Sequence, residues 1–218
     1  MRLEGGNQWP SELPELKTAF TQWQEQVQRA CLKLLRAFAR ALELPEDAFD
    51  ALYGENSYEH YKIIRYPAAF DGHTQGVGAH KDGGLITFVL QDEQSGLQGL
   101  INGEWVDVPP LEESVVVNIG EFLEMATNGY LKATIHRVNL SHTERFSTAY
   151  FLGAQLDKNA PIFRLKPEFA AQTKGVDTDP KNPLLRNVAE NYFKRMIRSH
   201  PDVAKVHHSD LVDRFKFA

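Results

Sequence analysis

The stretch GVGAHKDGGLITFVLQD, residues 76–92, decides the fold. Its second half, GLITFVLQ at 84–91, is apolar on both faces of an extended chain, because successive side chains of a strand point to opposite sides. Such a strand is stable only where both faces of its sheet are covered. We therefore expect a layered fold, with helices on one side of this sheet and a partner sheet on the other.

The residues around this stretch repeat the same kind of pattern. Short segments rich in Val, Ile, Thr and aromatic residues are separated by Gly, Asp, Asn and Pro about every eight to twelve residues, which indicates successive β-strands. About eight strands is the number that forms a double-sheet jelly roll. The fold class is therefore mainly β with flanking α: a double-stranded β-helix (jelly roll) core, a long N-terminal helix and C-terminal helices. The expected strands are 60–66, 76–81, 84–91, 97–100, 104–108, 114–119, 132–139 and 145–153.

Helices are expected on both sides of the strand region. Apolar residues spaced by three or four predict one long helix over 11–44, with Cys31 packed on its apolar face. A shorter helix is expected after Pro45, another over 121–128, and amphipathic helices after residue 183. We predict a single domain, 1–218, made of a helical N-terminal part (11–52), the jelly roll (about 58–156) and a C-terminal helical tail (157–218).

The charge balance limits the partners. The 218 residues include 24 Lys and Arg against 29 Asp and Glu, a net charge of -5 with both signs interspersed, which argues against nucleic acid and anionic membranes as partners. A single cysteine excludes an intrachain disulfide, and the first residues lack the layout of a secretion signal. No apolar run approaches the roughly 20 residues of a membrane span. We expect a cytoplasmic protein.

Three His-x-Asp pairs occur, more than chance predicts for this composition: His80/Asp82, His200/Asp202 and His208/Asp210. On a strand, residues i and i+2 share a face and can bind one ion, whereas in a helix they lie about 200° apart and cannot. The second and third pairs fall at helix ends, where solvated surface groups are expected. His80 and Asp82 end a β-type segment and precede Gly83-Gly84, so this pair is the candidate metal site.

A third ligand must come from a distant strand. His136 in KATIHRV is flanked by apolar residues, while His60, His73 and His142 lie at strand edges or in loops. Two imidazoles and one carboxylate on one face of a metal suit non-haem Fe(II), because three positions stay open for O₂ and substrate. Alone, His136 would be better explained as a hydrogen-bonded core histidine; the pair His80/Asp82 favours a ligand.

Nine residues after His136 comes Arg145-Phe-Ser147, whose first and third side chains point the same way on a strand. An arginine that faces the interior is costly unless an anion meets it, and its planar guanidinium matches a carboxylate through two parallel hydrogen bonds. A small dicarboxylate could thus bind the metal with one end and Arg145 and Ser147 with the other. The alternative is a structural salt bridge from Arg145 to a nearby Asp or Glu.

These residues resemble the isopenicillin N synthase-like branch of the Fe(II)- and 2-oxoglutarate-dependent dioxygenases. The resemblance covers roughly residues 5 to 165 and includes, in the family's order, IIRYP, GVGAHKDGGLITFVLQD, GLQGLINGEWVDVPP, SVVVNIGEFLEMATNGYLKATIHRV and RFSTAYF. It implies Fe(II) on His80, Asp82 and His136. It also implies a carboxylate of 2-oxoglutarate or of the substrate on Arg145 and Ser147, with Tyr66 of the RYP motif as a neighbour.

The sequence departs from the family at two points. The chain begins almost at the linker NQWP, whereas family members usually carry a further N-terminal segment that helps to wall the active site, so it looks N-terminally short. Where many 2-oxoglutarate users have Asn-Tyr-Tyr-Pro, this chain has Ile64-Arg65-Tyr66-Pro67, which is similar to isopenicillin N synthase, an enzyme that uses no 2-oxoglutarate.

Three functions remain open at this point. The first is an oxygenase that uses Fe(II), 2-oxoglutarate and O₂ to hydroxylate, desaturate or cyclise a small-molecule substrate. The second is an Fe(II) oxidase without 2-oxoglutarate, and the third is a non-catalytic metal-binding jelly roll. A short N-terminus would also expose apolar sheet surface, over which we expect a covering helix or a second copy in a homo-oligomer.

Overall fold

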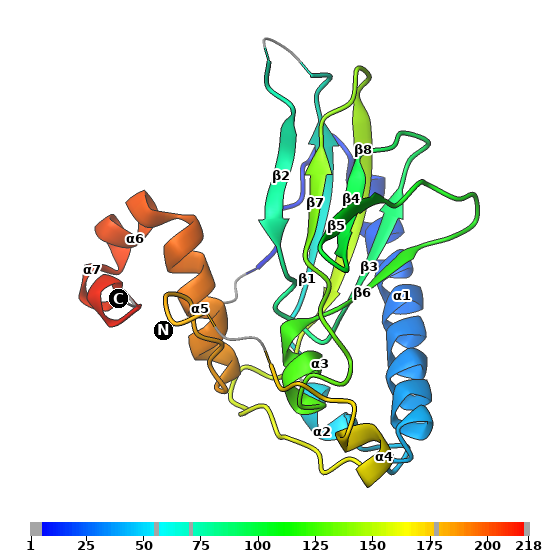
Figure 1. Ribbon diagram of the computed structural model, residues 1–218. Coiled ribbons are helices and arrows are strands. Elements are labelled where there is room, and N and C mark those ends of the chain that lie inside the picture. The colour runs from blue at the N-terminus through cyan, green and yellow to red at the C-terminus, as the bar shows by residue number, and fades with distance from the viewer. Residues whose placement is uncertain (1–5, 55–56, 70–71, 177–178, 216–218) are drawn as a thin grey trace.

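The computed structural model describes residues 6–54, 57–69, 72–176 and 179–215 (Figure 1). Within these ranges eight strands form two four-stranded antiparallel sheets that face each other, as the predicted jelly roll requires. The first sheet has the order β1 (Glu59–Tyr66), β8 (Arg145–Leu152), β3 (Ile86–Gln91) and β6 (Val116–Ile119). The second sheet has the order β2 (Gln75–His80), β7 (His136–Asn139), β4 (Leu97–Ile101) and β5 (Glu104–Asp107).

The strand register determines which side chains face the space between the sheets. On the first sheet Tyr66 of β1 lies opposite Arg145 of β8, and Gln91 of β3 lies opposite Ser147. Alternate residues share a face, so one face of β8 carries Arg145, Ser147, Ala149 and Phe151 while the other carries Tyr150 and Leu152. On the second sheet His80 pairs with His136. The polar residues singled out from the sequence thus lie on inward-facing surfaces.

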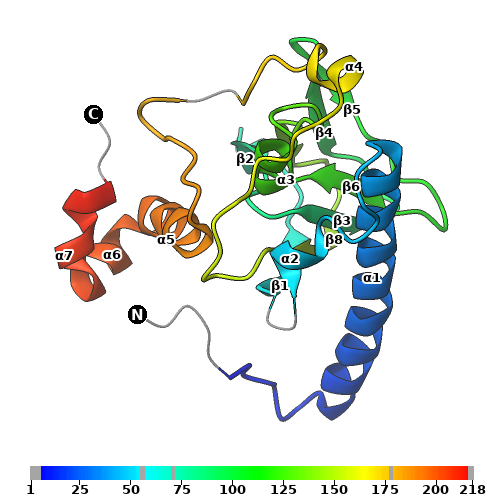
Figure 2. The ribbon, with the colours of Figure 1, turned by 90° about the horizontal axis from the view of Figure 1, so that it is seen from below.

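Helix α1 (Pro14–Ala41) covers the outer face of the first sheet, as Figure 2 shows from below. Its buried residues Val27, Cys31, Leu35 and Ala39 recur every four positions and therefore form one face. They join a single hydrophobic cluster with Ile86, Phe88, Tyr150 and Leu152 of the sheet. Burial of each such large side chain contributes about 2 kcal/mol. On its outer face, the strand that is apolar on both faces is therefore covered by α1 at Ile86 and Phe88, and its inner face is covered by the second sheet, as predicted.

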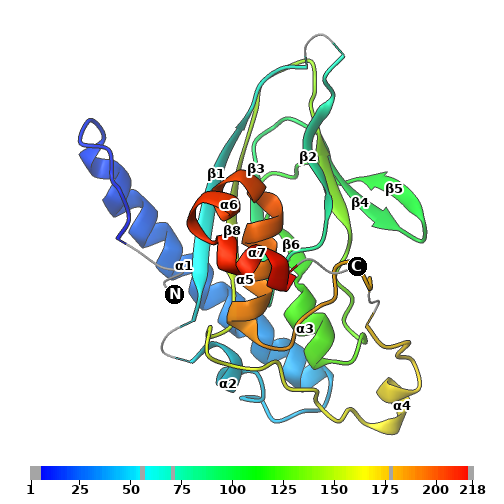
Figure 3. The same cartoon turned by 90° about the vertical axis from the view of Figure 1, so that its left-hand side faces the viewer.

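The remaining helices lie at one end and one side of the sandwich. Helix α3 (Glu121–Ala126) connects β6 to the segment before β7, and α2 (Asp50–Tyr53) and α4 (Pro167–Ala170) lie near the same end (Figure 1). Helix α5 (Val188–Ser199) begins at Asn187, whose side chain accepts a hydrogen bond from the Glu190 backbone N–H at 3.0 Å. It continues into α6 (Pro201–His207), α7 (Ser209–Val212) and the 3₁₀ turn Asp213–Phe215. Figures 1 and 2 show these helices on the opposite side of the sandwich from α1, and Figure 3 shows them in front of the strands.

The predicted elements are present, with differences at their ends. The strand expected over 132–139 begins only at His136, and the one expected over 84–91 begins at Ile86. Gly84 belongs to a turn whose backbone touches that of Gly120, where a Cβ would lie 2.0 Å from the Gly84 carbonyl oxygen. The helix expected after Pro45 begins at Asp50. The strand over 84–91 therefore begins later than side-chain periodicity predicts, because Gly84 contacts Gly120 from a distant part of the chain.

Part of the outer face of the first sheet lies beyond the reach of α1. Ile63, Leu90, Val117 and Phe146 lie there, and 60% of Ile63 is exposed. The covering helix or second copy expected over such a surface stays a prediction. No helix in the described ranges is long and apolar enough to cross a bilayer.

Candidate functional site

His80, Asp82 and His136 meet between the two sheets. Asp82 Oδ1 lies 3.6 Å from His80 Nε2 and 3.7 Å from His136 Nε2, and one ligand atom from each of the three residues lies within 4.8 Å of the others. Asp82 and His136 are buried, while His80 is partly exposed. Among the residues that the structure describes, this is the one group of at least three such side chains that could hold a metal ion.

The hydrogen bonds of the two imidazoles involve Nδ1 and leave Nε2 of each ring free to bind a metal ion. Nδ1 of His80 lies 2.8 Å from the Gly78 carbonyl oxygen, and Nδ1 of His136 lies 3.0 Å from the Thr134 carbonyl oxygen. A carbonyl only accepts, so each Nδ1 carries the proton and each Nε2 presents its lone pair to the common centre. Burial and the adjacent His136 lower the pKa of His80, which favours this neutral form. Metal-binding histidines are oriented in this way.

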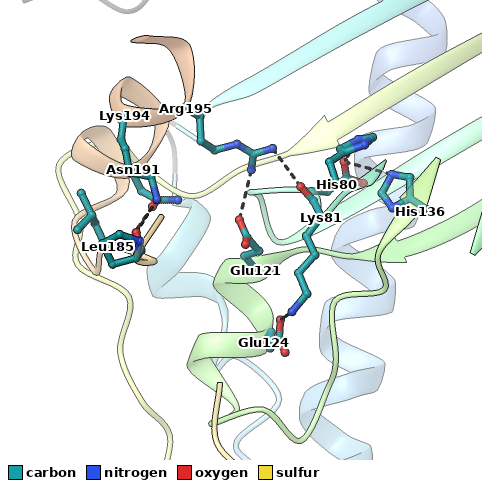
Figure 4. A network of polar contacts seen from close by, with 11 residues as sticks. His80, Lys81, Glu121, Glu124, His136, Leu185, Asn191, Lys194 and Arg195 are labelled. Atoms are coloured by element: carbon teal, nitrogen blue, oxygen red, sulfur yellow. Dashed lines mark hydrogen bonds and ion pairs between the residues drawn. The ribbon is translucent and has the colours of Figure 1, made fainter. Parts of the chain in front are cut away.

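Asp82 is held from its other oxygen and from its backbone. The Asn118 side-chain amide donates to Asp82 Oδ2 at 3.4 Å, which leaves Oδ1 toward the histidines. The Asp82 carbonyl accepts from the Glu121 backbone N–H at 2.7 Å, at the start of α3. Lys81 lies between the proposed ligands His80 and Asp82 in the sequence, but its side chain points away from theirs. Its ammonium group pairs with the buried Glu124 carboxylate at 2.9 Å (Figure 4). Lys81 is therefore held in an ion pair outside the metal-binding cluster.

Arg145 lies at the other end of the same inner face and is only 1% exposed. Its Nε donates to the Gln94 carbonyl at 3.1 Å, its Nη2 donates to Gln91 Oε1 at 2.8 Å, and its guanidinium lies 4.9 Å from the centroid of the Tyr66 ring. Nη1 is buried and has no hydrogen-bond partner in the described ranges. None of the ion pairs found there involves Arg145. The alternative of a structural salt bridge is therefore not what the structure contains.

One cavity of about 80 Å³ joins the two groups. His80, Asp82 and His136 line it together with Arg145 and Ser147. Tyr66 also lines it, and the small side chain of Ala149 leaves space between Ser147 and Phe151. A larger open cleft of about 780 Å³ lies at the turns after β3 and before β6, but it contains acidic side chains and no histidine. The small inner cavity is therefore the candidate site.

The structure separates the other candidate residues from this site. His73, His200 and His207 are exposed, and His208 caps a helix end against Phe193. Arg65 pairs with Glu144 on the outer side, and Arg137 lies 4.0 Å from the centroid of the Trp105 ring. His60 and His200 both line a cavity beside the site, and His60 stacks on Phe151 at 4.3 Å between ring centroids.

Sequence reasoning missed the residues that support the site. Gln91 and Gln94 hold Arg145, Asn118 holds Asp82, and Arg195 of α5 donates to the Lys81 carbonyl at 3.1 Å (Figure 4). Alternation along 84–91 places Gln91 inward and could have indicated its role. No sequence pattern indicates Arg195, because its contact joins residues that are 114 positions apart.

The donor set fits a divalent metal and an organic acid. Two imidazoles and one carboxylate converge on one point, as a 2-His-1-carboxylate site requires. A buried guanidinium with an unpartnered Nη1 is costly unless an anion reaches it. The jelly roll, the His-Asp-His cluster and the buried guanidinium together place the protein in the class of jelly rolls whose inner face fits a metal ion and an organic acid.

Comparison with known proteins agrees with a site for a metal ion and an organic acid. Residues 56–154 match the 2OG-Fe(II) oxygenase superfamily. A 2-oxoglutarate-dependent dioxygenase of Gibberella zeae is 37% identical over 150 residues, covering 64% of this chain and 39% of the relative. Another, from Dothideomycetidae sp., is 30% identical over 221 residues, covering 91% of this chain and 59% of the relative. The crystal structure of a full-length Neurospora crassa protein in complex with alpha-KG has a TM-score of 0.76 at 24% identity, covering 91% of this chain and 62% of that one.

This chain carries a 2OG-Fe(II) oxygenase superfamily domain. The expected isopenicillin N synthase-like grouping is consistent with that result. The chain spans 39% and 59% of the length of the two curated relatives, less than two thirds in each case.

Proposed function

We propose that this protein is a non-haem Fe(II)- and 2-oxoglutarate-dependent oxygenase that oxidises a small-molecule substrate. The observation that carries the proposal is the shared cavity, with a His-Asp-His cluster at one end and a buried, partly unpartnered guanidinium at the other. The relatives' description as 2-oxoglutarate-dependent dioxygenases favours this function over an oxidase without 2-oxoglutarate and over a non-catalytic domain.

In this proposal each inner residue has one role. His80, Asp82 and His136 hold Fe(II) through Nε2, Oδ1 and Nε2. Arg145 and Ser147 bind the distal carboxylate of 2-oxoglutarate, with Nη1 as the free donor, while the Tyr66 ring supports the guanidinium. When bound, iron and the oxo acid together activate O₂ for oxidation of a C–H bond.

The protein itself orients the reactants and limits water. Gln91 and Gln94 fix the guanidinium before the co-substrate arrives, so little ordering is required on binding. The two Nδ1–H groups stay bonded to backbone carbonyls, which prevents the imidazoles from rotating away from the centre. Thr87, Val89, Leu97 and Val138 line the rest of the inner cavity, a largely apolar lining that excludes water.

Anaerobic titration tests the proposal. Addition of 2-oxoglutarate to the Fe(II)-loaded protein is expected to produce a weak visible charge-transfer band, and addition of O₂ is expected to yield succinate. Arg145→Gln should weaken 2-oxoglutarate binding by about tenfold to a hundredfold, the value of a charge-assisted hydrogen bond. Arg65→Gln, which removes an equal charge on the outer side of the neighbouring strand, should bind normally.

The outcomes separate the three functions. Fe(II) binding without the band indicates an oxidase that uses no 2-oxoglutarate. Metal binding that is lost in His80→Ala and Asp82→Ala, with no band, no succinate and no O₂ consumption from any preparation, indicates a non-catalytic metal-binding jelly roll.

A further inference from the structure

A second cavity of about 280 Å³ adjoins the metal-binding cluster. It shares Lys62, His80, Asp82 and Phe151 with the inner cavity, so the two cavities are adjacent. Its opposite wall comes from α5, through Tyr192, Arg195, Met196 and Ser199. Figure 4 shows Arg195 reaching from α5 to the backbone beside His80. Helix α5 lies outside residues 56–154, which match the superfamily, so this wall is a feature that the matched domain does not supply.

The size of this cavity suits a small organic molecule. Small-molecule sites usually span about 300 to 1,000 Å³, and this cavity of about 280 Å³ lies just below that range. Rings of Tyr58, His60, Phe151 and Tyr192 contribute to its wall. Such a wall favours an apolar, ring-containing body.

The charges around the cavity favour an anion. Lys62 lies on the inner face of β1, opposite Ala149 of β8, and its Nζ lies 5.4 Å from the centroid of the Phe151 ring. None of the ion pairs found in the described ranges involves Lys62. Arg195, by contrast, has the Glu121 carboxylate at 3.5 Å. Lys62 is thus an exposed positive charge at the edge of this cavity, without an ion-pair partner in the described ranges.

The net charge of the proposed metal and 2-oxoglutarate sites also favours an anionic substrate. The charges of a divalent metal, Asp82, Arg145 and dianionic 2-oxoglutarate cancel one another. Lys62 then remains as one net positive charge beside the space left for substrate.

We infer that the substrate is a small carboxylic acid with an apolar ring, whose carboxylate pairs with Lys62 while its body lies between Phe151 and the α5 wall. This inference rests on the proposed function, because it assigns the substrate class of the same site. Lys62 is the residue that selects an acid over its neutral analogue. Met196, which is 46% exposed and lines the α5 wall, limits the length of the ring-containing body.

The test uses phenylacetate and phenylacetamide as a matched acid and amide. Each is titrated by calorimetry into the full chain loaded with Ni(II), which prevents turnover, and with excess 2-oxoglutarate, so that Arg145 is already occupied. The original chain should bind the acid about fivefold more tightly than the amide, the effect of a partly exposed ion pair. Lys62→Gln should remove this preference and Lys62→Arg should retain it. Arg65→Gln, three residues along the same strand but on the outer face, should leave it unchanged.

A second pair of variants tests the location. Met196→Trp should weaken binding of both probes, whereas Val206→Trp on α6, at an exposed position outside the cavity, should not. Equal binding of acid and amide by the original chain would overturn the inference, as would an unchanged preference in Lys62→Gln or an equal loss in Arg65→Gln. Binding of Ni(II) and 2-oxoglutarate is measured on the same samples. Its loss overturns the proposed function, and its persistence without an acid preference overturns only the assignment of substrate class.

Discussion

Replacement of Lys81 by methionine should destabilise the fold strongly, although the residue lies next to two proposed metal ligands rather than in the hydrophobic core. Lys81 pairs with Glu124 at 2.9 Å, and the two side chains are 17% and 1% exposed. The Lys81 ammonium bonds to Glu124 Oε2, and Glu124 Oε1 has no hydrogen-bond partner in the described ranges. Lys81→Met therefore leaves a buried carboxylate without a counter-charge.

The expected magnitude follows from this burial. Removal of one partner of a buried ion pair costs about 3 to 5 kcal/mol, and the partial exposure of Lys81 places the cost near 3 kcal/mol. For a chain of 218 residues, about 3 kcal/mol corresponds to a decrease in Tm on the order of 7 °C. The double variant Lys81→Met, Glu124→Leu removes both charges and should recover most of the loss.

The assay is urea and thermal unfolding of the metal-free protein, analysed as a double-mutant cycle. The matched control is Arg29→Met, which breaks an exposed pair with Glu25 at 4.0 Å and should change stability by less than about 0.5 kcal/mol. A coupling energy below about 0.5 kcal/mol between Lys81 and Glu124 would show that the pair is solvated and would refute the reasoning.

Three further predictions concern α5 and the core. Arg195→Gln should weaken Co(II) affinity by about tenfold to a hundredfold, because Arg195 holds the Lys81 backbone between the two proposed ligands His80 and Asp82. Arg198→Gln, on the solvent side of the same helix, should leave Co(II) affinity unchanged, and equal affinities of the two variants would exclude this positioning role. Burial lowers the pKa of Lys194 to about 8, so the unfolded chain binds more protons between pH 8 and 10.5. Stability should therefore rise with pH across that window by about 3 kcal/mol relative to Lys194→Met in urea unfolding, and parallel curves would contradict this. Burial raises the pKa of the Cys31 thiol to about 12, so iodoacetamide at pH 8 should label this thiol only after unfolding. Rapid labelling of the native protein would show that α1 is not packed as described.

Much of the architecture could be predicted because it depends on local periodicity. The stretch at 84–91 is apolar on both faces, and the structure covers it with α1 on one side and the second sheet on the other. The proposed ligands His80 and Asp82 are two positions apart at a strand end, a spacing that is visible without any fold. Strand ends were predicted less well, since contacts such as that between Gly84 and Gly120 involve residues far apart in the sequence.

The sequence by itself determined the jelly roll, the long helix, and the candidate residues His80, Asp82, His136, Arg145 and Ser147, because alternation and spacing are local properties of the chain. Only the tertiary structure decided that the two imidazoles present Nε2 to Asp82, that Arg145 retains an unpartnered Nη1, and that α5 supplies a wall beside Lys62. The physical reason is that burial, charge compensation and hydrogen-bond partners depend on segments as much as 114 residues apart, which no local pattern encodes.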